Sequence, residues 1–296
     1  MKSLPRILAL AVLFAPGPSW ATQQVDETRP ARSDARLEID IVSGSLRIQG
    51  WDREEISIRG SIGDDVEALE IDGNDERITI DLDIPDGWGN RRKDIDAHLE
   101  ISAPFGTRLE VETISASIDA NGFTSTAELA TVSGAISLSG ALQSAQVETV
   151  SGSIDVEGEQ TRVEAESVSG SIDLRGISQS VDAATVSGHI VVSATSISRA
   201  HFESVSGRIE FRGSLDGGAR LDAEVHSGGV MLDLPADISA RFEIETFSGS
   251  IDNEFGPAAE RNDRYSPGKW LKFTTGDGNA EINVESFSGT IRLRKL

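Results

Sequence analysis

The chain has 296 residues, of which 38% are hydrophobic, 5% are aromatic and none is cysteine. The absence of cysteine excludes disulfides, thiol catalysis and zinc–thiolate sites. A formal net charge of −22 argues against binding to nucleic acid or to anionic lipid headgroups, since no basic patch stands out against it.

The first 21 residues have the three parts of a secretory signal peptide. Lys2 and Arg6 give a positive start, and Ile7–Ala15 is an apolar run too short to cross a bilayer. Small residues stand at positions −3 and −1 of a cleavage site after Ala21. We therefore predict cleavage there, export to the periplasm or the cell exterior, and no integral membrane segment in the mature chain. A lone N-terminal anchor is the alternative.

Two segments lie between this signal and the regular part of the chain. Residues 22–34 are polar, contain a proline and have no period, which predicts a flexible leader. In residues 35–106 apolar and polar residues alternate in short runs that glycines interrupt, which predicts strands that cap the N-terminal end of the domain. Val42-Ser43-Gly44 is an early, isolated copy of the phrase that dominates the rest of the chain.

From about residue 107 to residue 252 a Ser-Gly phrase recurs at intervals of 18 to 21 residues. Self-similarity at such a period is typical of a solenoid. The repeated serines are Ser115, Ser133, Ser151, Ser169, Ser187, Ser206, Ser227, Ser248 and, after a longer interval, Ser288. The predicted fold is all-β, a single-chain β-solenoid (β-helix) with coils of roughly 18 residues, N-terminal capping strands and a C-terminal insertion.

Each position of the repeat has its own character. The residues six and four before the serine, and those three and five after it, are small or apolar, as inward positions of two strands should be. The residue three before the serine is often acidic, and the residue directly before it is mostly Val, Ile or Phe. A glycine follows the serine in every regular coil but the first, which has Ala116, and this predicts a corner with close backbone approach.

The C-terminal part departs from this period. Residues 253–278 contain Gly256-Pro257 and Pro267-Gly268, which predicts a loop or hairpin insertion that folds over the flank or the end of the solenoid. Residues 279–296 are predicted to form the last coil. The charges within Ile291–Leu296 would then blunt an exposed strand edge.

The repeated serines are poor candidates for catalysis. A nucleophile requires one serine with a positioned base, whereas recurrence in every coil indicates packing. His226 precedes Ser227, but neighbours on a strand point to opposite faces. The sequence predicts no catalytic, cofactor-binding or metal-binding residue.

The best candidate for an interaction face is an acidic row four positions after the repeated serine. Its members are Asp119, Asp155, Asp173, Glu210 and Asp252. Such a row is compatible with a divalent cation or a basic partner, although the G-G-x-G-x-D calcium repeat is absent. A face that only solubilises the protein is the plain alternative.

Several motifs together resemble one known family. They are Ile48–Ile56 (IQGWDREEI), Ala103–Val111 (APFGTRLEV), the Thr-Val-Ser-Gly coils, Phe247–Gly256 (FSGSIDNEFG) and Thr274–Gly278 (TTGDG). From about Ala35 to the C-terminus the chain resembles the bacterial putative-adhesin family of β-strand-repeat proteins, a domain of unknown function. The resemblance implies a β-solenoid of the bacterial envelope with no established activity and no catalytic residues.

The expected function is that of a non-enzymatic, exported adhesion or interaction scaffold in the bacterial envelope. Its expected partner is an envelope protein or a glycan, with no cofactor and no nucleic acid. One alternative is a structural protein that forms filaments by joining solenoids end to end. The other is a polysaccharide-active β-helix enzyme, for which the insertion over residues 253–278 would have to form the wall of a groove.

Overall fold

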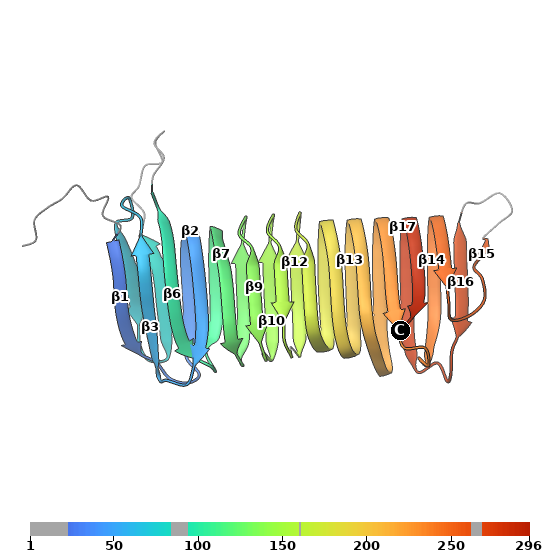
Figure 1. The fold of residues 1–296 in the computed structure, drawn as a ribbon, viewed down its shortest axis with the longest axis horizontal. Helices are drawn as coiled ribbons and strands as arrows, with labels where there is room; N and C mark the ends of the chain where they lie inside the picture. Colours follow the sequence, from blue (N-terminus) through green and yellow to red (C-terminus); the bar gives the residue numbers. More distant parts are fainter. Residues whose placement is uncertain (1–22, 84–93, 160, 262–267) are drawn as a thin grey trace, which may run out of the picture.

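The computed structural model describes residues 23–83, 94–159, 161–261 and 268–296. They form an elongated stack of β-strands, and the described ranges contain no helix, which confirms the all-β class (Figure 1). Accordingly, no helix in these ranges is long and apolar enough to cross a membrane. The predicted signal peptide lies outside the described residues.

Most strands are short and run across the long axis of the stack (Figure 1). Their bounds are β1 Gln23–Pro30, β2 Arg36–Trp51, β3 Glu55–Ile62, β4 Ala68–Gly73, β5 Arg77–Asp83, β6 Asp96–Pro104, β7 Arg108–Phe123, β8 Thr126–Thr131, β9 Ile136–Gly140, β10 Ser144–Thr149, β11 Ile154–Glu157, β12 Arg162–Ser167, β13 Ile172–Leu234, β14 Ala240–Asn253, β15 Glu260–Arg261, β16 Lys269–Thr274 and β17 Ala280–Lys295.

A regular coil consists of two strands joined at the Ser-Gly corner. The first strands of successive coils, β8, β10 and β12, pair in parallel, and so do the second strands, β9 and β11. Equivalent repeat positions lie opposite one another, so that Val147 has Leu129 on one side and Ala165 on the other. The stack therefore has two parallel sheets, which we call the first-strand sheet and the second-strand sheet. β13 winds through several coils without a break at the corners.

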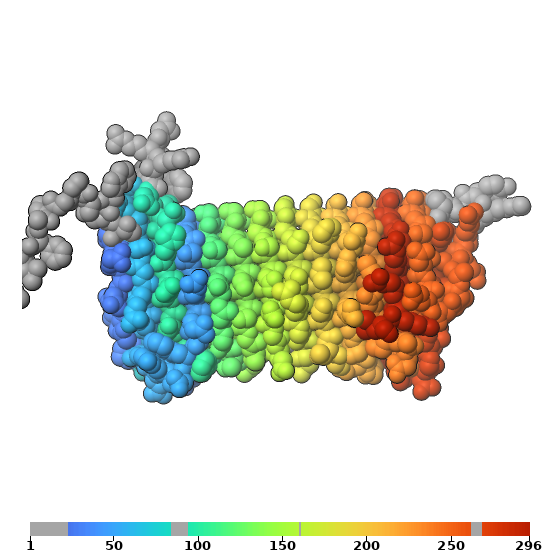
Figure 2. Space-filling view, viewed as in Figure 1, coloured from blue at the N-terminus to red at the C-terminus, as the bar shows by residue number. Residues whose placement is uncertain are grey.

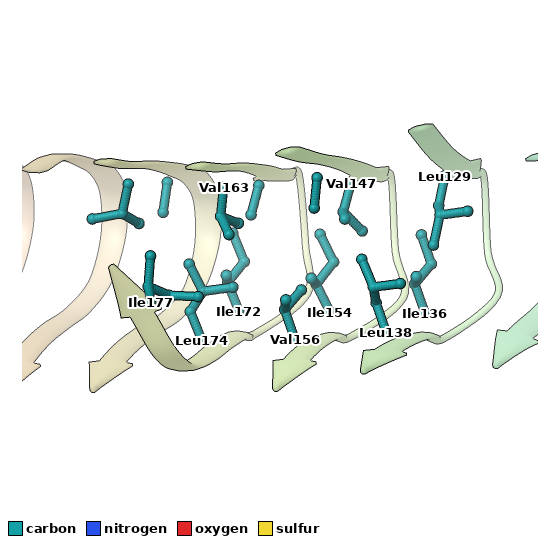
Figure 3. Close-up of a cluster of buried hydrophobic side chains, with 14 of the residues drawn as sticks. Leu129, Ile136, Leu138, Val147, Ile154, Val156, Val163, Ile172, Leu174 and Ile177 are labelled. Carbon is teal, nitrogen blue, oxygen red and sulfur yellow. The ribbon is translucent and has the colours of Figure 1, made fainter. Parts of the chain in front are cut away.

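The core fills the space between the two sheets (Figure 3). Val147 and Val163 point inward from the first-strand sheet and meet Ile154 and Ile172 from the second, and all four are at most 1% exposed. These are the positions four or six before the serine and three after it, as the repeat predicts. Because side chains alternate along a strand, the residues between them must face outward.

β2 is the first coil of the stack, which corrects its interpretation as an isolated copy. It pairs in parallel with β7 along nearly its whole length, with Ser43 opposite Ser115. Its other edge pairs with β5 and β6, which come later in the chain. The segment after β2 therefore folds back over the end of the stack and places β2 inside it.

The prediction of a flexible leader over residues 22–34 is wrong. Gln23–Pro30 forms β1, which pairs antiparallel with β3 over its whole length, and β3 pairs antiparallel with β6. Without β1, the long edge of β3 would be open, and open edges invite pairing with other chains. Ala31 and Ala35, which follow β1, are buried and hold this strand to the core. Pro30 is the last residue of the edge strand, a position that tolerates the missing N–H.

The C-terminal strand also lies inside the stack, which corrects the prediction that residues 279–296 form the last coil. β17 pairs in parallel with the end of β13 on one edge and with β14 on the other, so Ser288 lies opposite both Ser227 and Ser248. In Figures 1 and 2 the red C-terminal segment accordingly separates two orange ones. Its basic side chains do not blunt an edge: Arg294 is 2.8 Å from Asp233 of the neighbouring coil.

The insertion over residues 253–278 covers the outer end of the stack. Its described part includes β16, which pairs antiparallel with β14, and the short β15 beyond it, so it is more than a loop. The buried Phe242 of β14 has Phe273 at 4.4 Å and Phe255 at 5.8 Å between ring centroids. These three rings close the core at this end.

Candidate docking groove

The predicted acidic row lies on the second-strand sheet, and its charges have basic partners. Asp155 and Asp173 sit on adjacent coils, and both are 2.8 Å from the guanidinium of Arg175. The other three pairs are Asp119 with Arg47 at 3.9 Å, Glu210 with Arg208 at 3.2 Å, and Asp252 with Arg292 at 3.6 Å. The structure thus brings only Asp155 and Asp173 onto adjacent coils, with Ser137 between Asp119 and Asp155, and it leaves little free charge on the row.

No group of three or more metal-ligating side chains that could hold an ion occurs within the described ranges. The repeated serines have a structural role, because Ser133 donates its hydroxyl to the carbonyl oxygen of Ile114 and Ser151 to that of Val132, each at 3.3 Å. His226 is stacked on Phe287 at 4.8 Å. The corner serines Ser133 and Ser151 are thus bonded to backbone carbonyls, whereas in the early phrase Ser43 donates to Asp96 at 2.6 Å and the Ser45 hydroxyl lies 2.9 Å from Nδ1 of His98.

A long groove of about 1150 Å³ runs along the outside of the first-strand sheet, next to the corners. In successive coils it is lined by the residues one, two and three positions before the repeated serine. In the coil of Ser151 these are Val150, Thr149 and Glu148. We call the three sets the apolar row, the hydroxyl row and the glutamate row.

The apolar row is exposed along the whole groove. In order along the stack it comprises Ile114, Val132, Val150, Val168, Val186, Val205, His226, Phe287 and Phe247. Its hydrophobic members are 45–57% exposed. At the C-terminal end the ring of Phe287 is stacked between His226 at 4.8 Å and Phe247 at 4.9 Å. Single exposed apolar residues are common in proteins, but a contiguous row marks an interaction surface.

The hydroxyl row is buried and fixes the geometry of the corner. The hydroxyls of Thr149 and Ser167 accept hydrogen bonds from the backbone N–H groups of Gly152 and Gly170 at 2.9 and 2.8 Å. Because this residue points inward, the next residue of the strand must point outward. The hydrogen-bonded hydroxyls of Thr149 and Ser167 therefore position Val150 and Val168 at the surface. The hydroxyls of Ser204, Thr246 and Ser286 are buried without a hydrogen-bond partner among the described residues, and Val225 takes this position in the coil of Ser227.

The glutamate row runs beside the apolar row on the same outward face. It comprises Glu112, Glu148, Glu166, Glu203, Glu224, Glu285 and Glu245, interrupted by Ala130 and Ala184. In the part of the chain that the structure describes, no lysine or arginine forms an ion pair with this row, and the nearest base is His201, 3.0 Å from Glu203. Acidic residues two positions earlier do have partners, such as Arg36 for Glu110 and Arg220 for Asp222. Uncompensated negative charge is thus concentrated at the groove.

Desolvation and neighbouring carboxylates raise the pKa of one member of this row, Glu166. Desolvation raises the pKa of the Glu166 carboxyl, and the charges of Glu148, Glu164, Asp182 and Glu203 raise it further. At Asp222 desolvation acts in the same direction, but hydrogen bonds from Arg220 and Asn283 outweigh it and lower the pKa. The ionised form of Glu166 in the groove is therefore disfavoured by its surroundings, whereas the ionised form of Asp222 outside the groove is stabilised by its partners.

Replacing Glu166→Gln is expected to raise the melting temperature at pH 7 by about 1–2 °C. The folded-state pKa of Glu166 is raised, so its ionised form destabilises the folded state above that pKa. The cost disappears as the pH falls below the unfolded value, and the gain should vanish toward pH 4. The control Asp222→Asn should behave oppositely, lowering the melting temperature at pH 7. A lower melting temperature for Glu166→Gln at pH 7 would contradict the repulsion.

The sequence shows the residue types of both outward rows, but the groove that they share becomes visible only in the structure. The alternation of inward and outward residues along each first strand predicts that these two rows lie side by side. Residues two, four and six before the serine share the inward face, so residues one and three before it must share the outward face. An apolar residue at an outward position of every coil was the feature that could have identified the groove.

A family model described as Toastrack DUF4097 matches residues 35–234 of the chain. The chain belongs to this Toastrack family. Membership confirms the resemblance that the motifs indicated, and its match begins just before β2 and ends with β13. The part of the Toastrack chain formed by β14–β17, with its cap, therefore lies beyond the matched residues.

Several solved structures are similar to this Toastrack chain at low sequence identity. A putative adhesin from Bacteroides fragilis is 14% identical, with 94% of this chain and 100% of that chain covered and a TM-score of 0.45. A putative lipid binding protein from Parabacteroides distasonis is 14% identical, with 90% and 96% covered and a TM-score of 0.40. A putative adhesin from the same species is 9% identical, with 92% and 98% covered and a TM-score of 0.37. Comparison with curated proteins finds no match.

Proposed function

We propose that the mature chain is a non-enzymatic, exported interaction scaffold of the bacterial envelope, and that it docks a partner along the groove of the first-strand sheet. The observation that carries the proposal is the exposed apolar row beside the uncompensated glutamate row. The signal-peptide pattern of residues 1–21 supports export.

The dimensions of the groove favour an elongated partner. The apolar row passes through nine coils, and with strands about 4.8 Å apart it extends over roughly 38 Å. Repeat arrays of this kind present continuous surfaces that bind extended partners. A ladder of identical positions is well suited to adhesion, because contact area grows with every coil that a partner covers.

Other features argue against the two alternatives. A filament that continues the solenoid needs a parallel coil at each end, but antiparallel strands lie over both ends here, β1 and β4 at one and β16 at the other, and they interrupt the parallel register that a second copy would continue. A polysaccharide-active enzyme needs catalytic groups in a cleft. The described part of the insertion, residues 253–261 and 268–278, covers the end of the stack and does not line the groove.

Retention on isolated envelopes of the producing bacterium tests the proposal. Purified mature chain is expected to be retained, and the double variant Val150→Asp, Val168→Asp should lose at least 90% of this retention, an estimate based on the energy of interface hot spots. The variant Asp155→Asn, Asp173→Asn removes two carboxylates from the second-strand sheet and should be retained like the wild type. Equal retention of the Val150, Val168 variant would refute docking at the groove.

Export has a separate test. Protein recovered from the envelope fraction should begin at Thr22, as N-terminal sequencing would show. Recovery of the chain with Met1 intact in the cytoplasm would refute this part of the proposal.

A further inference from the structure

We infer that the partner segment that fits this groove is a cationic amphipathic α-helix of up to about 25 residues. Its apolar side chains would lie on the apolar row, and its lysines or arginines would face the glutamate row. The inference rests on the proposed docking function and adds the chemistry and the conformation of the partner.

Charge selects a cationic partner. The glutamate row has no lysine or arginine partner in the described ranges, and after desolvation the charges of Glu148 and Glu203 in this row contribute to the raised pKa of Glu166. A cation placed beside them relieves this repulsion, whereas a second copy of the chain, with a net charge of −22, adds to it. A neutral glycan would satisfy neither the carboxylates nor the exposed valines. The partner therefore needs positive charge and an apolar face together.

The hydrogen bonding of the sheet selects a helix. Along the groove each first strand already pairs on both edges, as β10 does with β8 and β12. An extended peptide lying across these strands finds no free strand edge, so its own N–H and C=O groups would lose water without gaining partners. A helix satisfies these groups internally. An apolar stripe can then be buried without leaving unpaired backbone groups.

The length of the groove and the spacing of its coils agree with the length and pitch of one α-helix. The groove, of about 1150 Å³, is open along its length of roughly 38 Å, so the side chains of one helix face can enter it while the rest of the helix stays outside. A helix of that length has about 25 residues and seven turns, spaced about 5.4 Å apart. This spacing is close to the 4.8 Å between coils, whereas same-face residues of an extended chain are about 6.7 Å apart. Over a few neighbouring coils each turn can therefore place one apolar side chain near one coil, and over the whole groove seven turns span nine coils.

The probe for the test is a labelled 24-residue peptide of leucine, alanine and lysine, with leucines on one stripe at the helical period and lysines along one flank. Its binding to the mature protein is followed by fluorescence anisotropy, and its helicity by circular dichroism. We expect saturable binding with a gain of helix. A peptide of the same composition in scrambled order should bind at least tenfold more weakly.

Variants of the protein separate the two rows. Val150→Asp with Val168→Asp should weaken binding at least tenfold at any salt concentration. Glu148→Gln with Glu166→Gln should weaken it several-fold in 50 mM salt and have little effect in 500 mM salt, where the charges are screened. The matched control Asp155→Asn with Asp173→Asn changes net charge equally on the other sheet and should bind like the wild type. Melting curves of all variants verify that they are folded.

Three results would overturn the inference: no binding of the probe, equal binding of the scrambled peptide, or binding without a gain of helix. The two experiments together distinguish failure of this inference from failure of the proposed docking function. If envelope retention depends on Val150 and Val168 but the probe does not bind, docking at the groove stands and the cationic helix is refuted. If neither retention nor peptide binding depends on these residues, both proposals fall.

Discussion

A disulfide is expected to form between Ser227→Cys and Ser288→Cys, although these residues are far apart in the repeat order. The structure places them directly opposite one another on β13 and β17. Adjacent strands are about 4.8 Å apart, within the range of Cα separations for a disulfide, whereas two coils are about 9.6 Å apart and cannot be bridged. If β17 were the last coil in sequence order, the β14 coil would lie between these serines and the bond could not form.

The natural chain contains no cysteine, so engineered pairs can be tested without interference. Ser227→Cys with Ser248→Cys should stay reduced, because β17 separates these residues. Ser248→Cys with Ser288→Cys should be oxidised with either coil order and serves as a positive control. Mass spectrometry after mild oxidation distinguishes the three pairs. Bridging of Ser227→Cys to Ser248→Cys would show that the coils follow the order of the sequence.

The disulfide should also stabilise the protein strongly. A bond between positions 227 and 288 closes a loop of about 60 residues, which in the chain-entropy account corresponds to about 4 kcal/mol. Engineered bonds often yield less because they distort the backbone. The melting temperature of the oxidised protein should nevertheless exceed that of the reduced protein, since both serines are exposed and their replacement disturbs no core contact.

The sequence predicted the coil but not the order of the coils, and the reason is physical. Every copy of the Ser-Gly phrase offers the same alternation of side chains and the same backbone edge, so Ser288 is complementary to both Ser227 and Ser248. The period fixes which residues lie opposite one another. The period does not determine which copies are neighbours. For the same reason it did not predict that β2 lies between β6 and β7.

The candidate groove was predictable in part. The inward positions followed from the repeat, and with them the outward position of residues such as Val150 and Glu148. Charge compensation was predictable only within a strand, where Asp173 and Arg175 stand two residues apart on one face, because the contact between Arg175 and Asp155 forms only after the coils have stacked. The acidic row of the second-strand sheet and the glutamate row look alike in sequence. They differ in whether basic side chains pair with their carboxylates, which decides whether the row can attract a cation.

Replacing Gly170→Ala is expected to destabilise the protein by about 3 kcal/mol, near the upper end for overpacking. A Cβ added at Gly170 would lie 1.6 Å from the carbonyl oxygen of Gly152 in the adjacent coil. The obstacle is backbone, so no change of rotamer relieves it. For a domain of this size the melting temperature should fall by roughly 6–12 °C.

The control is Gly217→Ala, because nothing lies within 4 Å of a Cβ added at Gly217. Its effect should be within about 0.5 kcal/mol. The natural exception, Ala116, does not weaken the argument. It lies opposite Gly44, whose φ of +119° differs from the φ of Gly152 and Gly170, which is not positive at either residue.

The corner glycine also connects stability to the groove. The N–H of Gly170 donates to the hydroxyl of Ser167 at 2.8 Å, and this inward hydroxyl sets the outward direction of Val168. A backbone shift that makes room for the new Cβ would move this part of the apolar row. Gly170→Ala should therefore weaken envelope retention even below its melting temperature, whereas Gly217→Ala should not. Full retention together with a large loss of stability would mean that the groove tolerates displacement of a corner.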